Sequence, residues 1–567
     1  MTTVEPQTLA DRATLRAATL CEAFQLTAAE YADQVALRTP GDGTSITFRE
    51  YADRVERIAA GFAALGVERG DTVGLMLRNR PEFNLVDTAA LHLGATPFSV
   101  YSTSAPEQIE YLFANAGNRV VVTERMFLPQ LRGAVARGSR IEHIVLVDGD
   151  EDGTTPLAWL EERAPSGFDF QQAWRAVEPR DVLTLIYTSG TTGPPKGVQI
   201  THANMMAEVR GCAAVIPPRA GGRVVSYLPS AHIADRWSSH YLASICFGCT
   251  ITSVADPKEV VAHLPEARPT VWGGVPRVWE KIKAALENQG VVDPAGLPEE
   301  VKQGIRRKLG LDEVDWSVAG GAPTSVEVLE YFRDLGIPIC ELWGMSELSC
   351  AATLNPPDAI KIGTCGPPLP GVEVKLAEDG ELLCRGEIVM AGYRREPEKT
   401  AAAIDPDGWL RTGDVATIDE DGYVSIVDRK KELIINAAGK NMSPANIESR
   451  LKSAHPLIGQ AMAIGDRRPY NVALLVLDPD GCAAYAAEQG LSDPSPAALA
   501  RDGRVRDTVA EAVDEANAHL SRVEQIKRFA LLETEWEPGG DELTPTMKLK
   551  RRPIAEKYAE QIEALYA

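Results

Sequence analysis

One run in this sequence combines hydroxyl side chains, glycines and a lysine, and it reads Tyr187-Thr-Ser-Gly-Thr-Thr-Gly-Pro-Pro-Lys-Gly-Val198. Glycines let backbone N–H groups approach an anion closely, and serine and threonine hydroxyls add further donors. Residues 182–186 form an apolar stretch typical of a short buried strand, and residues 201–215 carry apolar side chains at helical spacing. The sequence therefore predicts a phosphate-binding loop between a strand and a helix.

This run differs from a Walker A loop, in which Gly-Lys is followed by Ser or Thr. Here a proline precedes the lysine and a glycine follows it. The two prolines carry no N–H, so this end of the loop cannot form a nest of backbone donors. The whole string instead resembles the phosphate loop of the adenylate-forming superfamily, which includes acyl-CoA synthetases, luciferases and the adenylation domains of peptide synthetases. The nucleotide-binding residues that this resemblance implies are Thr188, Ser189, Gly190, Thr191, Thr192, Gly193 and Lys196.

A second motif, Glu341-Leu-Trp-Gly-Met-Ser-Glu347, directly follows an apolar strand. Its aromatic side chain offers a face for stacking a base, and its last glutamate offers a hard oxygen ligand for Mg²⁺. The motif resembles the superfamily's aromatic-Gly-x-Thr/Ser-Glu motif, which implies that Trp343 faces the adenine and that Glu347 and Thr188 coordinate Mg²⁺. The same resemblance makes Gly320 a border of the acyl group. The further nucleotide-binding residues that it implies are Gly321, Ala322, Pro323, Leu342, Gly344, Met345 and Ser346.

A third motif ends in Thr-Gly-Asp414, where a carboxylate just past a turn can accept the hydroxyls of a ribose. It matches the superfamily's Thr-Gly-Asp motif, which implies that Asp414 binds the ribose of the nucleotide. Arg429 matches the family arginine that contacts the ribose or a phosphate. Lys431 falls at the position of the family's hinge, about which a small C-terminal domain rotates.

Two segments near the C-terminal end complete the resemblance. Residues 436–444 resemble the loop that enters the site for thioester formation, with Gly439 and Lys440 as its expected contacts to coenzyme A. Residues 543–551 form a basic cluster in a chain of net charge −22. Within that cluster Lys548 matches the family lysine that reaches the α-phosphate and the carboxylate during adenylation.

These residues suit a two-step activation of a carboxylic acid. Charge on ATP must be neutralised before a carboxylate can attack the α-phosphate, and Mg²⁺ on Glu347 and Thr188 together with Lys548 and Lys196 is suited to that task. The resemblance implies that the catalytic residues are Lys548, Glu347 and Thr188. It also implies that coenzyme A supplies the thiol of the second step.

The segments 227–237 and 275–281 resemble those of long-chain fatty acyl-CoA synthetases, which implies that His232 and Trp237 border the acyl group. We therefore expect an ATP-dependent ligase that converts a medium-to-long-chain fatty acid to its coenzyme A thioester. Transfer of the acyl group to a carrier-protein thiol and use of an aryl acid are the alternatives.

The composition limits the other functions. A net charge of −22 argues against a nucleic-acid-binding protein. Of nine scattered cysteines only Cys246 and Cys249 form a Cys-x-x-Cys pair, which we interpret as core side chains. Without a disulfide framework, a signal-peptide pattern or an 18-residue apolar stretch, we expect a cytoplasmic protein, with peripheral contact to the inner face of a membrane left open.

The elements that position these motifs alternate between strand and helix over most of the chain, which predicts parallel sheets with helices on both faces. After residue 366, short strands separated by Asp-Gly turns indicate an antiparallel β region. We expect an α/β fold: a large N-terminal adenylate-forming domain, residues 1–429, with parallel sheets and a β subdomain. A small, mobile α+β C-terminal domain, residues 430–567, carries the catalytic lysine.

Overall fold

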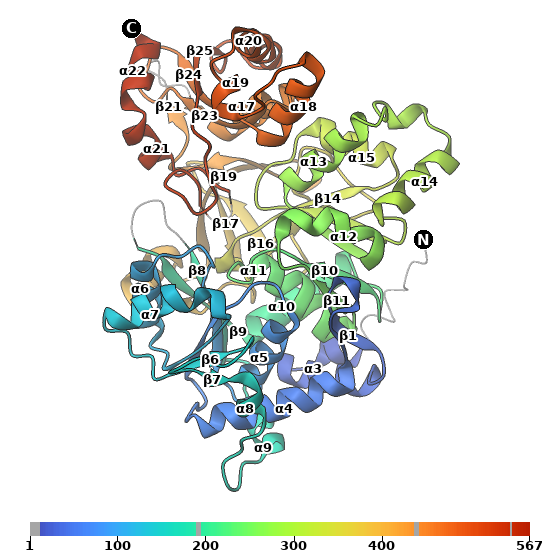
Figure 1. Cartoon of the computed structure of the whole chain (residues 1–567), viewed down its shortest axis with the longest axis vertical. Helices are drawn as coiled ribbons and strands as arrows, with labels where there is room; N and C mark the ends of the chain where they lie inside the picture. The colour runs from blue at the N-terminus through green and yellow to red at the C-terminus, as the bar shows by residue number, and fades with distance from the viewer. Residues whose placement is uncertain (1–11, 189–193, 436–440, 545–546) are drawn as a thin grey trace.

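A computed structural model of the whole chain describes residues 12–188, 194–435, 441–544 and 547–567. The C-terminal elements form a lobe above the rest of the molecule, and the elements of the first half of the chain lie at its lower end (Figure 1). The predicted α/β fold with a C-terminal domain is confirmed.

A five-stranded parallel sheet with the order β4-β3-β5-β6-β7 organises the first part of the chain. Its strands are β3 (Thr72–Met76), β4 (Thr96–Ser99), β5 (Val120–Thr123), β6 (His143–Leu146) and β7 (Thr155–Pro156). The accompanying helices are α4 (Phe48–Ala64), α5 (Pro81–His92), α6 (Pro106–Ala116), α7 (Leu128–Ala136), α8 (Leu157–Glu161) and α9 (Phe170–Arg175). Strands and helices alternate as predicted, because parallel neighbours need a crossover connection.

Two four-stranded mixed sheets follow, in the orders β10-β11-β1-β2 and β12-β13-β14-β15. Each ends in an antiparallel edge strand, β2 or β15. Their strands are β1 (Val35–Arg38), β2 (Ser45–Thr47), β10 (Arg223–Ser226), β11 (Thr250–Ser253), β12 (Val271–Gly274), β13 (Trp316–Ala319), β14 (Ile339–Trp343) and β15 (Thr353–Leu354). The helices of this region are α2 (Ala13–Arg16), α3 (Leu20–Glu30), α10 (His202–Val215), α11 (Ile233–Asp235), the π-helix η3 (Arg236–Cys246), α12 (Val260–Ala267), α13 (Pro276–Glu287), α14 (Glu299–Leu309) and α15 (Val326–Asp334).

The predicted strand–loop–helix arrangement around the phosphate-binding loop is wrong. Strand β8 (Val182–Thr188) is followed by a second strand, β9 (Lys196–Thr201), which pairs with it antiparallel before helix α10 begins. The loop therefore connects the two strands of a hairpin, and the N-terminus of α10 is at the far end of β9. Strand β18 (Gly392–Tyr393) pairs with the other edge of β9.

The predicted antiparallel region is confirmed as a four-stranded sheet with the order β16-β17-β19-β20. Its strands are β16 (Glu373–Leu376), β17 (Glu381–Arg385), β19 (Leu410–Ile418) and β20 (Val424–Arg429), and α16 (Pro397–Ala403) lies before β19. The last part of the chain contains β21 (Ile434–Ile435), β22 (Asn441–Met442), β23 (Ile458–Ile464), β24 (Asn471–Leu477), β25 (Ile526–Leu532), α17 (Pro444–Ala454), α18 (Pro479–Gln489), α19 (Pro496–Leu499), α20 (Gly503–Ala518), α21 (Arg551–Lys557) and α22 (Ala559–Tyr566).

The C-terminal lobe has hydrophobic clusters of its own, formed by residues from Ile434 onward. Charged side chains connect it to helices α13 and α15 of the preceding part of the chain. The three ion pairs are Arg277–Asp478, Lys281–Asp480 with an Nζ–Oδ2 distance of 2.6 Å, and Arg450–Glu327 with an Nη1–Oε1 distance of 2.8 Å. These pairs link the lobe to the preceding part of the chain.

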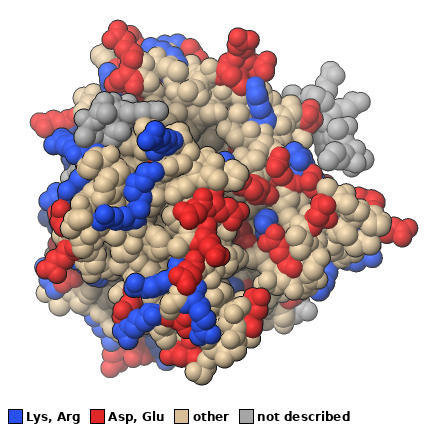
Figure 2. Space-filling view, turned by 90° about the horizontal axis from the view of Figure 1, so that it is seen from above, with Lys and Arg blue, Asp and Glu red and all other residues tan. Residues whose placement is uncertain are grey.

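Surface charge is mixed on the face of the molecule seen from above, where acidic and basic side chains lie side by side (Figure 2). Neither sign covers that face. Within the described ranges, no helix combines the length and apolar character needed to cross a bilayer. Cys246 and Cys249 are buried, free and part of the largest hydrophobic cluster, which agrees with their interpretation as core side chains.

Candidate active site

The hairpin β8–β9 places two of the predicted site residues on either side of the loop. Thr188 is the last residue of β8 and pairs with Lys196, the first residue of β9. The five loop residues predicted to bind phosphate, Ser189, Gly190, Thr191, Thr192 and Gly193, lie outside the described residues.

Lys196 and Glu347 approach the same tyrosine hydroxyl. Lys196 Nζ lies 2.8 Å from the hydroxyl oxygen of Tyr393, and that hydroxyl lies 2.9 Å from Glu347 Oε1. Loss of hydration lowers the pKa of Lys196, and the nearby carboxylate of Glu347 opposes this shift. The structure thus brings a loop lysine and the predicted metal ligand into one hydrogen-bonded chain.

The oxygen donors at this position fit a hard cation such as Mg²⁺. Glu347 lies in a short 3₁₀-helix after β14 and is only 6% exposed. Its Oε1 accepts a hydrogen bond from Tyr393, whereas no group among the described residues donates to its Oε2. A carboxylate oxygen that has no partner among the described residues suits a metal ligand, and the hydroxyl of Thr188 stays a predicted second ligand.

The strand end that carries the second motif is tightly packed. A Cβ atom added to Gly344 would lie 1.8 Å from the carbonyl oxygen of Cys350, so only glycine fits there. Trp343 is buried, and its Nε1 donates a 2.8 Å hydrogen bond to Asp414 Oδ2. Leu342, Met345 and Ser346 are buried or half-buried around them. The motif is therefore joined directly to the predicted ribose-binding carboxylate.

Asp414 is held from two sides. Its Oδ1 lies 2.8 Å from Arg429 Nε, and the two residues are direct cross-strand partners on β19 and β20. Burial raises the pKa of Asp414, although Arg429 and Trp343 oppose that shift. Each carboxylate oxygen retains a further lone pair, so Asp414 can still accept hydrogen bonds from two hydroxyls of a sugar.

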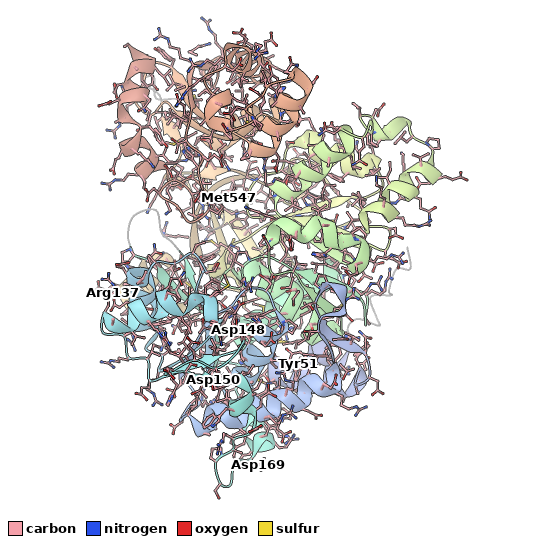
Figure 3. All side chains as sticks on the ribbon, in the orientation of Figure 1. Tyr51, Arg137, Asp148, Asp150, Asp169 and Met547 are labelled. Carbon is pink, nitrogen blue, oxygen red and sulfur yellow. The ribbon has the colours of Figure 1, made fainter. Side chains whose placement is uncertain are left out.

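Lys548 reaches this group from the C-terminal lobe. Met547, the residue before it, lies where the lobe meets the rest of the chain (Figure 3). Lys548 keeps contact with solvent. Partial loss of hydration among the surrounding protein groups, and then the charge of Arg429, lowers its pKa. Asp414, Glu432 and Glu347 lie within electrostatic range and oppose the shift. The fourth motif is thereby brought next to the second and third.

His232 also lies within electrostatic range of the lysine. Burial, and then the positive charge of Lys548, lowers the pKa of His232 to about 4, so its ring is neutral at pH 7. His232 Nδ1 accepts a 3.2 Å hydrogen bond from the backbone N–H of Ala234. Trp237 is buried farther along, and its indole approaches the buried side chain of Glu208. Burial raises the pKa of Glu208 to about 8.

A buried charge cluster fixes the segment that carries His232 and Trp237. Arg236 and Asp87 are both fully buried and form an ion pair, and Arg236 Nη2 donates a 2.9 Å hydrogen bond to Ser99. Burial alone would raise the pKa of Asp87, but Arg236 and then His240 hold it below its ordinary value. The charges thus tie the π-helix η3 to helix α5.

The remaining predicted residues are less enclosed. Gly320 is half-buried, and Gly321, Ala322 and Pro323 form an exposed turn after β13. Lys431 is exposed between β20 and β21. Gly439 and Lys440 lie outside the described residues, so their contacts stay predictions.

Sequence reasoning missed two tyrosines next to the loop. Tyr393 joins Lys196 to Glu347, and the hydroxyl of Tyr111 donates a 3.1 Å hydrogen bond to the carbonyl oxygen of Pro195. Tyr111 precedes the loop by 84 positions, counted to Pro195, and Tyr393 follows Lys196 by 197 positions. No local sequence pattern marks either tyrosine as a site residue. The sequence around Tyr393 shows only a tyrosine that follows a glycine, which does not by itself indicate a site residue.

Comparison with known proteins assigns the family. The profile of the AMP-binding enzyme family matches residues 24–394, and that of the AMP-binding enzyme C-terminal domain matches residues 431–567. The chain belongs to this family. A Mycobacterium tuberculosis relative named as a fatty-acid–CoA ligase, fadD11, is 54% identical, with 73% of this chain and 79% of the relative covered. The long-chain-fatty-acid–CoA ligase FadD15 of the same species is 34% identical, with 93% of each chain covered.

Solved structures share the fold. The anthranilate CoA ligase AuaEII in complex with anthranoyl-AMP has a TM-score of 0.76 at 21% identity, with 96% of this chain and 98% of that chain covered. The A-PCP didomain of a carboxylic acid reductase from Segniliparus rugosus has a TM-score of 0.76 at 20% identity, with coverage of 99% and 84%. These structures support the fold, and the family profiles together with the fatty-acid–CoA ligase relatives confirm the resemblance to the adenylate-forming superfamily.

Proposed function

We propose that this protein activates a medium-to-long-chain fatty acid with ATP and then forms its coenzyme A thioester. The observation that carries the proposal is the placement of Lys548 within electrostatic range of Arg429, Asp414 and Glu347. Membership of the AMP-binding enzyme family and relatives named fatty-acid–CoA ligases support the same chemistry.

In the first step, a carboxylate oxygen of the fatty acid attacks the α-phosphorus of ATP, and pyrophosphate leaves. Lys548 supplies positive charge between the two anions that must meet, and Arg429 adds a second cation nearby. Asp414 holds the ribose through its free lone pairs. Bound Mg²⁺ supplies charge neutralisation on the phosphates, and Glu347 and Thr188 are the residues suited to hold it.

In the second step, the thiol sulfur of coenzyme A attacks the acyl carbonyl carbon, and AMP leaves. We propose that Lys431, after β20, is the hinge that lets residues 430–567 turn between the two steps as a domain distinct from residues 1–429. The presence of Lys548 among the nucleotide residues supports assignment of the orientation seen here to the first step. Gly439 and Lys440 would then contact coenzyme A after the turn.

The acyl group would pass between His232, Gly320 and Trp237. Support comes from the place of His232 within electrostatic range of Lys548 and from the apolar, buried surroundings of Trp237. We further propose that the protein works in the cytoplasm and collects lipid at the inner face of a membrane. Transfer to a carrier-protein thiol is the second candidate, favoured by the fold shared with an A-PCP didomain.

The test is release of AMP and pyrophosphate with acetate, benzoate and fatty acids of increasing length, each with and without coenzyme A. We expect coenzyme A-dependent AMP release that peaks with medium or long chains. Pyrophosphate release without any effect of coenzyme A would favour the carrier-protein candidate. The highest AMP release with benzoate would show that the substrate is an aryl acid. No release of AMP or pyrophosphate with any of the acids would refute the proposal.

A further inference from the structure

The hydroxyl of Tyr393 lies between a cation and an anion of the site. An ammonium can only donate hydrogen bonds and a carboxylate can only accept them, so both bonds have a fixed direction. Lys196 donates to the tyrosine oxygen at 2.8 Å, and the tyrosine donates its proton to Glu347 Oε1 at 2.9 Å. The three side chains therefore form one chain of two hydrogen bonds, from the ammonium through the hydroxyl to the carboxylate.

The backbone of Tyr393 is fixed by its neighbours. Strand β18 pairs with β9, with Tyr393 opposite Val198, so the tyrosine and Lys196 lie on directly paired strands. The backbone N–H of Tyr393 donates a 2.9 Å hydrogen bond to Thr400 Oγ1, and the backbone N–H of Met390 donates to the carbonyl oxygen of Glu347 at 2.9 Å. The ring lies against Lys196, with Nζ 4.0 Å from the ring centroid. The hydroxyl thus has little freedom to leave its position.

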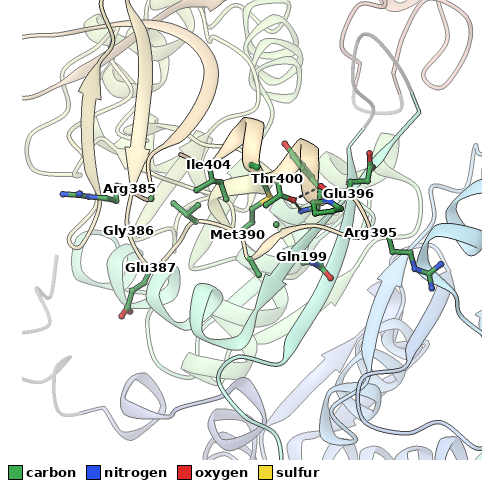
Figure 4. Close-up of a pocket in the computed structure, with 16 residues that line it drawn as sticks. Gln199, Arg385, Gly386, Glu387, Met390, Arg395, Glu396, Thr400 and Ile404 are labelled. Atoms are coloured by element: carbon green, nitrogen blue, oxygen red, sulfur yellow. Dashed lines mark hydrogen bonds between the residues drawn. The ribbon is translucent and has the colours of Figure 1, made fainter. Parts of the chain in front are cut away.

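The strand that carries the tyrosine borders a pocket of about 850 Å³ on the surface. Figure 4 shows this pocket, with Gln199 on β9, Met390 before β18, and Thr400 and Ile404 on α16 and at its C-terminal end. Tyr393 is part of the lining, so the residue that joins Lys196 to Glu347 also borders this pocket.

The hydroxyl keeps the two charges from pairing directly. Among the described residues, no ion pair forms between Lys196 and Glu347, although the two side chains lie within electrostatic range. A direct pair would occupy a carboxylate oxygen that a metal ion needs and would neutralise a cation that phosphate needs.

We propose that Tyr393 is a positioning residue of the adenylation site, because its hydroxyl spaces Lys196 from Glu347 and aims the carboxylate at the metal ion. The inference rests on the proposed adenylation and deepens it. The contacts of the Tyr393 hydroxyl among the described residues are those to Lys196 and Glu347. It acts through the two charged residues, and its loss is expected to weaken metal binding as well as the first half-reaction.

The test is Tyr393→Phe, which keeps the ring and its packing and removes only the hydroxyl. We expect Mn²⁺ to bind roughly 10- to 100-fold more weakly to the complex of the variant with a non-hydrolysable ATP analogue, as measured by electron paramagnetic resonance. This range follows from the loss of a hydrogen bond to a charged group. The adenylation rate should fall by a similar factor, while reaction of coenzyme A with preformed acyl-adenylate should keep its rate.

Tyr331→Phe is the matched control, since it also removes one tyrosine hydroxyl, whose 2.7 Å hydrogen bond goes to the carbonyl oxygen of Val291 far from the loop. That variant should bind Mn²⁺ as the wild type does. Unchanged Mn²⁺ affinity or an unchanged adenylation rate in Tyr393→Phe would overturn the inference. A wild-type protein that binds Mn²⁺ and the ATP analogue but forms no acyl-adenylate would refute the proposed function instead, which keeps the two failures distinct.

Discussion

Replacement of Lys548 by alanine separates the two half-reactions. The structure holds this lysine in place through a short turn, since its backbone N–H donates to Thr544 Oγ1 at 3.0 Å and its carbonyl oxygen accepts from the N–H of Thr544 at 2.8 Å. Truncation of the side chain therefore removes a preorganised cation without removing the turn. Loss of one such donor costs a factor of about 10² to 10³ in rate, or ~2.7–4 kcal/mol. We expect adenylation to fall by that factor.

The assay follows each half-reaction separately. Adenylation is measured as fatty-acid-dependent exchange of pyrophosphate into ATP, and thioester formation is measured as AMP release from preformed acyl-adenylate and coenzyme A. The second rate should change little, because the lysine is needed only where the carboxylate meets the α-phosphate. Lys527→Ala, which removes an exposed lysine on β25, should leave both rates unchanged. Equal losses in both half-reactions of Lys548→Ala would refute the assigned role.

Two further predictions concern the charges around the site. In the double variant Arg277→Ala, Lys281→Ala, which loses the pairs to Asp478 and Asp480, adenylation should fall roughly 2- to 30-fold if each pair contributes the ~0.2–1 kcal/mol of a surface ion pair. High salt should reduce the difference in adenylation rate between the variant and the wild type. Equal adenylation rates at low salt would show that the ion pairs do not hold the lobe. Asp87→Ala should lower the free energy of unfolding by about 3–5 kcal/mol, because it leaves Arg236 buried and unpaired. Urea denaturation measures this loss, and a change below about 1 kcal/mol would contradict the buried ion pair.

Much of the fold follows from local signals. Continuous apolar runs such as Val120–Thr123, bounded by polar turns, predicted the parallel strands, and Asp-Gly turns predicted the antiparallel region. Strand β9 was not predicted, because it is short and directly follows a loop rich in glycine and proline, although Val198 and Ile200 alternate and are both buried. A strict count of the two-residue period would have found it.

In the candidate site too, residues within contiguous motifs were predicted and residues paired over long sequence separations were not. Trp343, Asp414 and Lys548 each stand in a contiguous motif, so their sequence neighbours revealed them. Tyr393 stands in a strand of two residues and meets Lys196 across 197 positions, and such a pairing leaves no local trace in a single sequence. The partnership of Asp87 with Arg236, 149 positions apart, was invisible for the same reason.

The order of the elements explains how one lysine can serve the first step alone. Asp414 and Arg429 are paired on adjacent strands, and Trp343 joins them from β14, so all three belong to one rigid group. The chain leaves that group through Lys431 and returns Lys548 to it from the C-terminal lobe. A rotation at Lys431 would withdraw Lys548 and leave the ribose-binding carboxylate unmoved. The nucleotide could therefore stay bound while the lysine gives way to the thiol.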